Sequence, residues 1–91
     1  MLVRGELDVD TGPRVEDELR RAALARAPKV VLDLREVTFF DSTGLQIVLD
    51  ADLRAREDGH AFTLVATEGE PLRVLQLAEV TERLSIELHG G

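Results

Sequence analysis

Short apolar runs alternate along this chain with longer segments whose apolar residues recur at helical spacing. The most apolar run, residues 29–34, suits a central strand covered on both faces. Further strand patterns lie at residues 2–7, 61–66 and 84–88, the last with strict alternation of apolar and polar side chains. This alternation predicts an α/β domain of order β-α-β-α-β-α-β, with a predominantly parallel or mixed four-stranded sheet and three or more helices.

Capping and helix-breaking residues mark the ends of the first two helices. Asp10 or Thr11 is expected to cap the first helix, and Pro28 ends it, because the residue before a proline avoids the helical conformation. The second helix begins within residues 41–44. It ends before Gly59, a candidate for the left-handed residue that commonly follows a helix.

Each helix carries a stripe of residues that should face the sheet. The expected faces are Val15, Leu19, Ala22, Ala23 and Arg26 in the first helix and Leu45, Val48, Leu49 and Leu53 in the second. A third helix opens at Glu70, and its face is either Leu72, Leu75 and Glu79 or Val74, Leu77 and Ala78.

Length and charge limit the classes of function. We expect residues 1–91 to form a single domain. The 18 acidic residues outnumber the 11 basic ones, which argues against binding to nucleic acid or to an anionic membrane. The chain has no cysteine, no apolar run near the roughly 20 residues of a membrane span and no signal-peptide pattern. We therefore expect a cytoplasmic protein without a metal or other cofactor.

The segment Asp41-Ser42-Thr43-Gly44 is the part of the sequence that most clearly indicates a functional site. It lies at a strand-to-helix junction, where backbone amides at the start of a helix lack partners and favour negative charge. A phosphate on Ser42 would add about −1.5 to −2 charges, attracted by those amides and repelled by Asp41. The same four residues make a good helix cap, and taken alone they favour a cap over a phosphorylation site.

A wider pattern changes that balance. The pattern consists of Gly5-Glu6-Leu7-Asp8, Thr11, Val31-Leu32-Asp33-Leu34, Val37, Phe39 and Asp41-Ser42-Thr43-Gly44-Leu45. In this order and separation it resembles the STAS family, and in particular the bacterial anti-sigma factor antagonists. The resemblance is strongest over residues 4–53 and fits the remainder of the chain more loosely.

The resemblance implies a partner-switching regulator of transcription. Such a protein binds an anti-sigma factor that is also a serine kinase and thereby frees the sigma factor. The kinase phosphorylates the serine that follows the aspartate, here Ser42, with Thr43 the weaker candidate, and a serine phosphatase reverses the step. The implied partner-binding residues are Asp8, Thr11, Asp41, Ser42, Thr43, Gly44 and Leu45.

The chain also departs from the family pattern. Members usually have a further strand ahead of the Gly-Glu-Leu-Asp strand, and here that first family strand is apparently missing. A missing strand would expose the backbone of a sheet edge, which favours pairing with another chain. We therefore expect a concentration-dependent homodimer formed through that edge.

Two other functions were weighed against the switch. A catalytic role would need partners for Ser42, yet His60 and His89 lie in a turn and a tail, and no glycine-rich phosphate loop is present. We therefore expect no enzymatic activity. The remaining alternative is a STAS interaction or scaffold module that is never phosphorylated, as in stress-sensing complexes or as an accessory subunit of a transport system.

Overall fold

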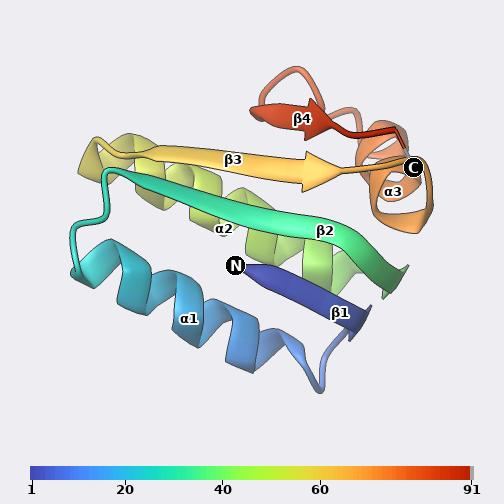
Figure 1. Ribbon diagram of the computed structural model, residues 1–91, viewed down its shortest axis with the longest axis horizontal. Coiled ribbons are helices and arrows are strands. Elements are labelled where there is room, and N and C mark those ends of the chain that lie inside the picture. Colours follow the sequence, from blue (N-terminus) through green and yellow to red (C-terminus); the bar gives the residue numbers. More distant parts are fainter. Residues whose placement is uncertain (91) are drawn as a thin grey trace.

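The computed structural model describes residues 1–90, in which parallel strands and helices alternate (Figure 1). The elements are β1 (Leu2–Leu7), α1 (Gly12–Leu24), β2 (Lys29–Phe40), α2 (Ser42–Asp58), β3 (Ala61–Ala66), α3 (Glu70–Leu77) and β4 (Ile86–Leu88). The four strands lie in the order β1-β2-β3-β4, and every neighbouring pair is parallel. The expected order of elements is confirmed, and within residues 1–90 the sheet is wholly parallel rather than mixed.

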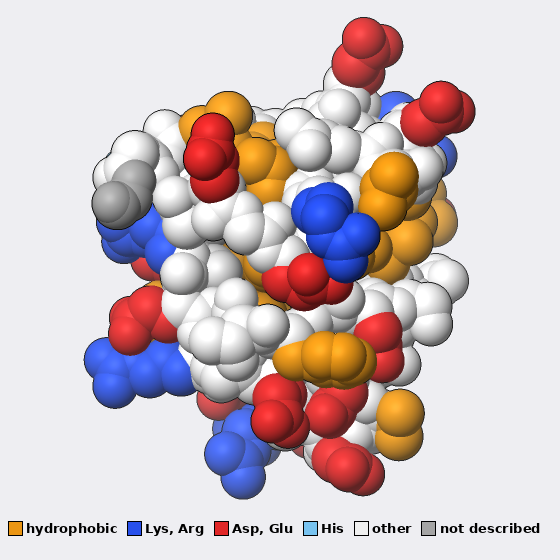
Figure 2. Space-filling view, turned by 90° about the vertical axis from the view of Figure 1, so that its right-hand side faces the viewer, with side chains coloured by type: hydrophobic (Ala, Val, Ile, Leu, Met, Phe, Trp, Pro, Cys, Tyr) orange, Lys and Arg blue, Asp and Glu red, His pale blue; other side chains and the backbone are white. Residues whose placement is uncertain are grey.

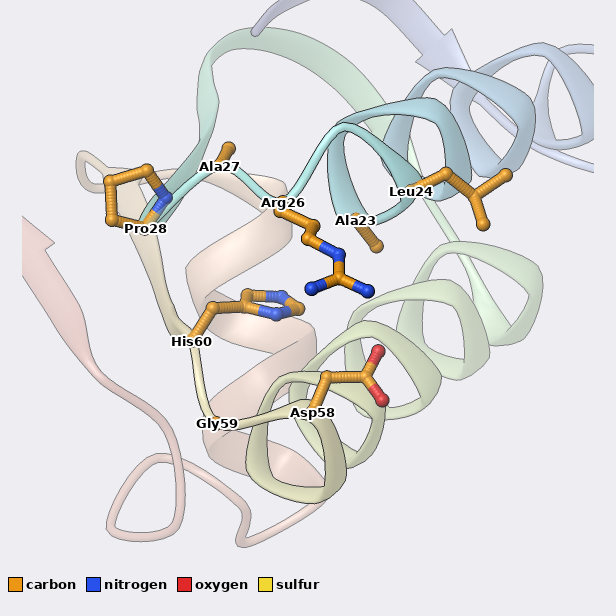
Figure 3. Close-up of a pocket in the computed structure, with 8 residues that line it drawn as sticks. All are labelled: Ala23, Leu24, Arg26, Ala27, Pro28, Asp58, Gly59 and His60. Carbon is orange, nitrogen blue, oxygen red and sulfur yellow. The ribbon is translucent and has the colours of Figure 1, made fainter.

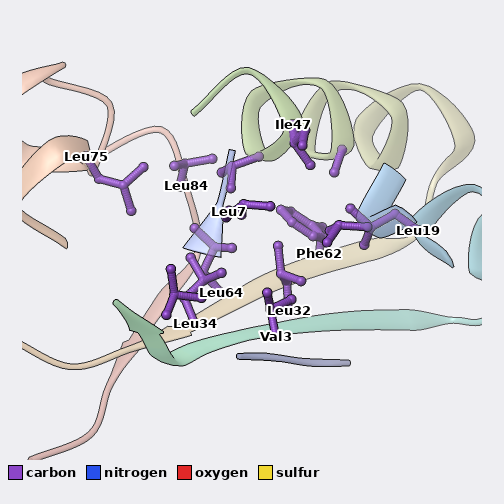
Figure 4. Packing of buried hydrophobic residues seen from close by; sticks show 14 of the residues in the cluster. Val3, Leu7, Leu19, Leu32, Leu34, Ile47, Phe62, Leu64, Leu75 and Leu84 are labelled. Carbon is purple, nitrogen blue, oxygen red and sulfur yellow. The ribbon is translucent and has the colours of Figure 1, made fainter. Parts of the chain in front are cut away.

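The core lies between one face of the sheet and the helices (Figure 4). Alternate residues of β2 and β3 supply its floor, and α1 and α2 supply its roof. The buried side chains from these elements are Val30, Leu32, Leu34, Phe62, Leu64, Val15, Leu19, Ile47, Val48, Ala51 and Ala55. Val31 and Asp33 alternate with the floor residues and are only partly buried. The second face of the strand at residues 29–34 is therefore only partly covered, where full cover of both faces was expected.

Strand β2 is longer than the predicted run at residues 29–34. It continues to Phe40 because β1 pairs with it from Asp33 onward, through two register shifts in which β2 carries an extra residue. Strand β4 is shorter than predicted. Its paired residues begin at Ile86, although the carbonyl oxygen of Ser85 already accepts a hydrogen bond of 2.8 Å from the Leu64 amide.

The helix boundaries agree with the sequence signals better than the helix faces do. Pro28 follows α1 as expected, but the helix stops at Leu24, so Arg26 lies outside it at a φ of 58°. The second helix ends as predicted, with Gly59 at a φ of 77°. Leu53 was wrongly placed on the buried face and is 56% exposed. Residues spaced by four drift about 40° around a helix at each step, which carries Leu53 away from the core.

In α3 the first of the two expected faces is the buried one. Leu72 and Leu75 are buried, whereas Leu77 is 71% exposed. Glu79 lies beyond the end of the helix at a φ of 59° and so is not part of that face. In the part of the chain that the structure describes, no helix combines the length and apolar character needed to cross a membrane.

Candidate functional site

Ser42 is exposed and is the first residue of α2, directly after the carboxyl end of β2. Asp41 precedes it in an extended conformation and caps the helix, because its Oδ1 accepts a hydrogen bond of 2.9 Å from the Thr43 amide. The carbonyl oxygen of Asp41 accepts a further bond of 3.0 Å from the Leu45 amide. The hydroxyl is thus accessible at a helix start where the Thr43 amide is already engaged by a carboxylate.

Gly44 lets α2 begin directly over an aromatic ring. A Cβ atom at this position would lie 2.7 Å from Cε2 of Phe40, and Phe40 is 2% exposed. The ring therefore has little freedom to move aside. A glycine permits such a close approach because it carries no side chain. The close approach that the structure shows is an internal one, between α2 and the core.

Asp8 organises the turn between β1 and α1. Its Oδ1 accepts hydrogen bonds from the amides of Asp10, at 2.9 Å, and Thr11, at 3.1 Å. The Thr11 hydroxyl donates to the carbonyl oxygen of Glu6 at 2.8 Å and accepts from the Asp8 amide at 3.0 Å. The Thr11 amide, followed by that of Asp10, holds the pKa of the Asp8 carboxyl below its ordinary value.

This arrangement corrects the predicted cap of α1. Thr11 is the residue before the helix, but its side chain makes no capping hydrogen bond. Its hydroxyl instead ties the turn back to β1. The carboxylate that binds free amides at this helix start belongs to Asp8, in a turn that short polar side chains favour.

The turn and the start of α2 lie against each other. A Cβ atom on Gly12 would lie 3.1 Å from Cγ2 of Thr43 and 3.0 Å from Cδ1 of Ile47. Leu7, just before the turn, is paired with Phe40, just before α2. The crossover fold therefore brings Asp8 and Thr11 to the same end of the sheet as residues 41–45.

Three further exposed residues lie at this end that the sequence analysis did not include among the partner-binding residues. Phe39 and Val9 are 45% and 69% exposed, and Glu6 is the register partner of Phe39 on the neighbouring strand. Figure 2 looks onto the carboxyl ends of the strands and shows hydrophobic side chains in its lower half with Asp and Glu side chains around them. The pair Phe39-Phe40 signalled an aromatic at this end, but only the pleat of β2 decides which ring faces the core.

A hollow of about 540 Å³ lies at the opposite end of the molecule, between the ends of α1 and α2 (Figure 3). Arg26, Asp58 and His60 line it, and the side chain of Arg26 extends toward the imidazole ring. His60 immediately precedes β3, whereas Ser42 follows β2. Because β2 and β3 are parallel, His60 and Ser42 lie at opposite ends of the sheet.

Comparison with known proteins places the chain in a family. The family model described as Mlab, STAS domain, matches residues 1–88. Proteins named anti-sigma-B factor antagonist, from Listeria monocytogenes and Listeria innocua, are each 25% identical to the chain over 87 residues. Each alignment covers 96% of this chain and 76% of the Listeria protein. The four parallel strands and the alternating helices agree with this match, and the chain belongs to the STAS domain family.

Proposed function

We propose that this protein is a cytoplasmic anti-sigma factor antagonist switched by phosphorylation of Ser42. The observation that carries the proposal is the exposed hydroxyl of Ser42 at the first position of α2, beside the Asp8 turn. The names of the Listeria relatives support the regulatory role. On this proposal, the unmodified protein binds an anti-sigma factor that is a serine kinase, and the bound sigma factor is released.

Phosphorylation of Ser42 Oγ would switch partner binding off by adding negative charge at that position. Ser42 Oγ attacks the terminal phosphorus of ATP held by the kinase, the new O–P bond replaces the bond to ADP, and the hydroxyl proton leaves to a kinase base. The product carries about −1.5 to −2 charges next to Asp41. Asp41 repels the phosphate, and a partner surface shaped for a neutral hydroxyl can receive the larger dianion only at a steric and desolvation cost, so the complex dissociates. A serine phosphatase removes the phosphate and restores binding.

Thr43 is the less suitable acceptor. It is only partly exposed, its amide is held by Asp41, and its methyl group lies against the start of α1 near Gly12. A kinase therefore has less access to the Thr43 side chain than to that of the exposed Ser42. We therefore assign the acceptor role to Ser42 and a contact role to Thr43.

The experiment is phosphorylation by each anti-sigma factor kinase of the source organism, purified singly and supplied with ATP, followed by mass spectrometry. One phosphate should appear on the wild-type protein and on Thr43→Val, and none on Ser42→Ala. The Ser42→Ala variant should stay bound to the kinase, while Ser42→Asp binds at least roughly tenfold more weakly. Equal affinity of the two Ser42 variants would contradict the proposed switch.

A second candidate is a STAS interaction module that is never phosphorylated. The exposed side chains of Val9 and Phe39 favour it, because they offer contact area that requires no modification. The same experiment separates the two candidates. Stable binding to a partner, with no phosphate gained from any active kinase of the organism, would select the unmodified module.

A further inference from the structure

Two large apolar side chains are exposed at the end of the molecule that bears Ser42. Phe39 is 45% exposed although the chain contains only three aromatic residues, and Val9 is 69% exposed in the turn after β1. Phe39 precedes Ser42 by three residues, so their Cα atoms lie within about 11 Å of each other. An aromatic ring held by a paired strand loses little entropy on binding, which suits it to anchor an interface.

The carboxylates around these side chains have no cationic partner. Elsewhere in residues 1–90, ion pairs join Arg4 to Glu36, Arg20 to Asp17, Arg35 to Asp33, Arg56 to Asp52, Arg73 to Glu70 and His89 to Glu87. None of these six pairs includes Glu6, Asp10 or Asp41. Glu6 lies directly beside Phe39 on the neighbouring strand, and Asp41 follows Phe39 by two residues. These three carboxylates are therefore in no ion pair within residues 1–90, although Arg4 and Arg14 line the same hollow as Glu6 and Asp10.

We propose that Glu6, Val9, Asp10, Phe39 and Asp41 form one docking surface, here called the acidic–apolar patch, for a basic face of the anti-sigma factor. On that face, an apolar depression receives the ring of Phe39, with Val9 beside it. Arg or Lys side chains around the depression face the three carboxylates. The inference rests on the proposed function and adds the chemistry of the partner surface to it.

The two kinds of group contribute differently. Burial of the Phe39 ring governs how long the complex lasts, because truncation of a central aromatic acts mainly on the dissociation rate. The unpaired carboxylates govern how fast it forms, through long-range attraction that salt screens. Phosphate on Ser42 adds to the same negative field at short range. This added attraction to a basic partner is outweighed where the phosphate meets the partner surface shaped for a neutral hydroxyl, so release comes from the steric and desolvation cost there and not from loss of the Phe39 contact.

The test uses the anti-sigma factor that binds the wild-type protein when those of the source organism are purified and screened singly by surface plasmon resonance. Phe39→Ala should bind it roughly thirtyfold more weakly, mainly through faster dissociation, and Phe39→Leu should recover part of the loss. Leu53→Ala on α2 is the matched control, because Leu53 is 56% exposed outside the patch. It should bind like the wild type.

A second arm tests the charges. Glu6→Gln combined with Asp10→Asn should slow association by roughly three- to tenfold at low ionic strength and flatten its dependence on salt. The control is Glu57→Gln combined with Asp58→Asn, which removes the same charge at the far end of α2. It should leave the salt dependence almost unchanged.

The outcomes separate the two proposals. Binding of the wild-type protein to no anti-sigma factor would overturn the proposed function and the docking surface together. Wild-type binding that Phe39→Ala does not weaken would overturn the docking surface and leave the function standing. Because the Phe39 side chain is already half exposed, Phe39→Ala should melt within about 4 °C of the wild type, so a binding loss would not reflect unfolding.

Discussion

Gly44 and Phe40 form the tightest contact of the site at the scale of single residues. A methyl group on Gly44 would press into the ring at 2.7 Å, and Phe40 is buried. Overpacking of this kind costs about 1–3 kcal/mol, whereas alanine gains about 1 kcal/mol over glycine within a helix. We expect Gly44→Ala to lower the free energy of unfolding by up to about 2 kcal/mol, measured by urea denaturation.

A double-mutant cycle identifies the cause of that loss. In the background of Phe40→Leu the ring is absent, so Gly44→Ala should become neutral or stabilising. The same loss in both backgrounds would contradict the steric explanation. It would point instead to the amides of the first turn of α2.

The Asp8 turn should make stability depend on pH. Hydrogen bonds from the Thr11 and Asp10 amides lower the pKa of the Asp8 carboxyl in the folded state below its ordinary value of 3.8. The stabilisation is therefore present above the ordinary pKa and is lost as the pH falls through the lowered one. We expect Asp8→Asn to reduce the loss of stability between about pH 6 and pH 2, measured as the midpoint of thermal unfolding.

Two features make this experiment specific. The pKa of Asp33 is also lowered, chiefly by the Arg35 guanidinium, so Asp8→Asn should remove only part of the acid sensitivity. Asp10→Asn is the matched control, because the Asp10 side chain accepts no hydrogen bond from any described residue, whereas its amide binds Asp8. An unchanged pH profile of Asp8→Asn would show that the turn does not hold the charge.

At the scale of elements, the end of α1 stores backbone strain. Arg26 adopts a φ of 58° just beyond the helix, in the left-handed region that favours glycine, and the Ala27 amide there donates to the carbonyl oxygen of Ala22. We expect Arg26→Gly to raise the free energy of unfolding by about 0.5–1 kcal/mol, after the entropy that glycine adds to the unfolded chain. Arg21→Gly, within α1, should instead destabilise by about 1 kcal/mol. If Arg26→Gly does not raise the free energy of unfolding, Arg26 is not strained.

At the scale of the whole molecule, β1 lies at one edge of the sheet, as the expected dimer requires. The strand bends at Gly5, where φ is 77°, and two register shifts interrupt its pairing with β2. Register shifts of this kind make an edge strand less suited to pair with another strand. Only the short part of β1 near Leu2 can therefore pair with a second copy of the chain. We therefore expect a weak dimer whose population rises with concentration in sedimentation equilibrium.

Lysine substitutions can test whether the dimer forms through the β1 edge. Leu2→Lys would place like charges across a two-fold interface and should shift the equilibrium to monomer. Leu77→Lys adds the same charge at an exposed position on α3 and should leave the equilibrium unchanged. A wild-type protein that is monomeric at every concentration would refute the dimer.

The sequence by itself determined the order of elements, the start of α2 within residues 41–44 and its end before Gly59, because capping residues and hydrophobic periodicity act within a few residues. It also placed Asp8, Thr11 and residues 41–45 in one candidate site through a resemblance, and the parallel crossovers bring them to one end of the sheet. Only the tertiary structure decided that Phe40 is buried and Phe39 exposed, and that Asp8 rather than Thr11 binds the amides before α1. These outcomes depend on the pleat and register of β2 against β1 and on how closely α1 approaches α2, and no local pattern encodes them.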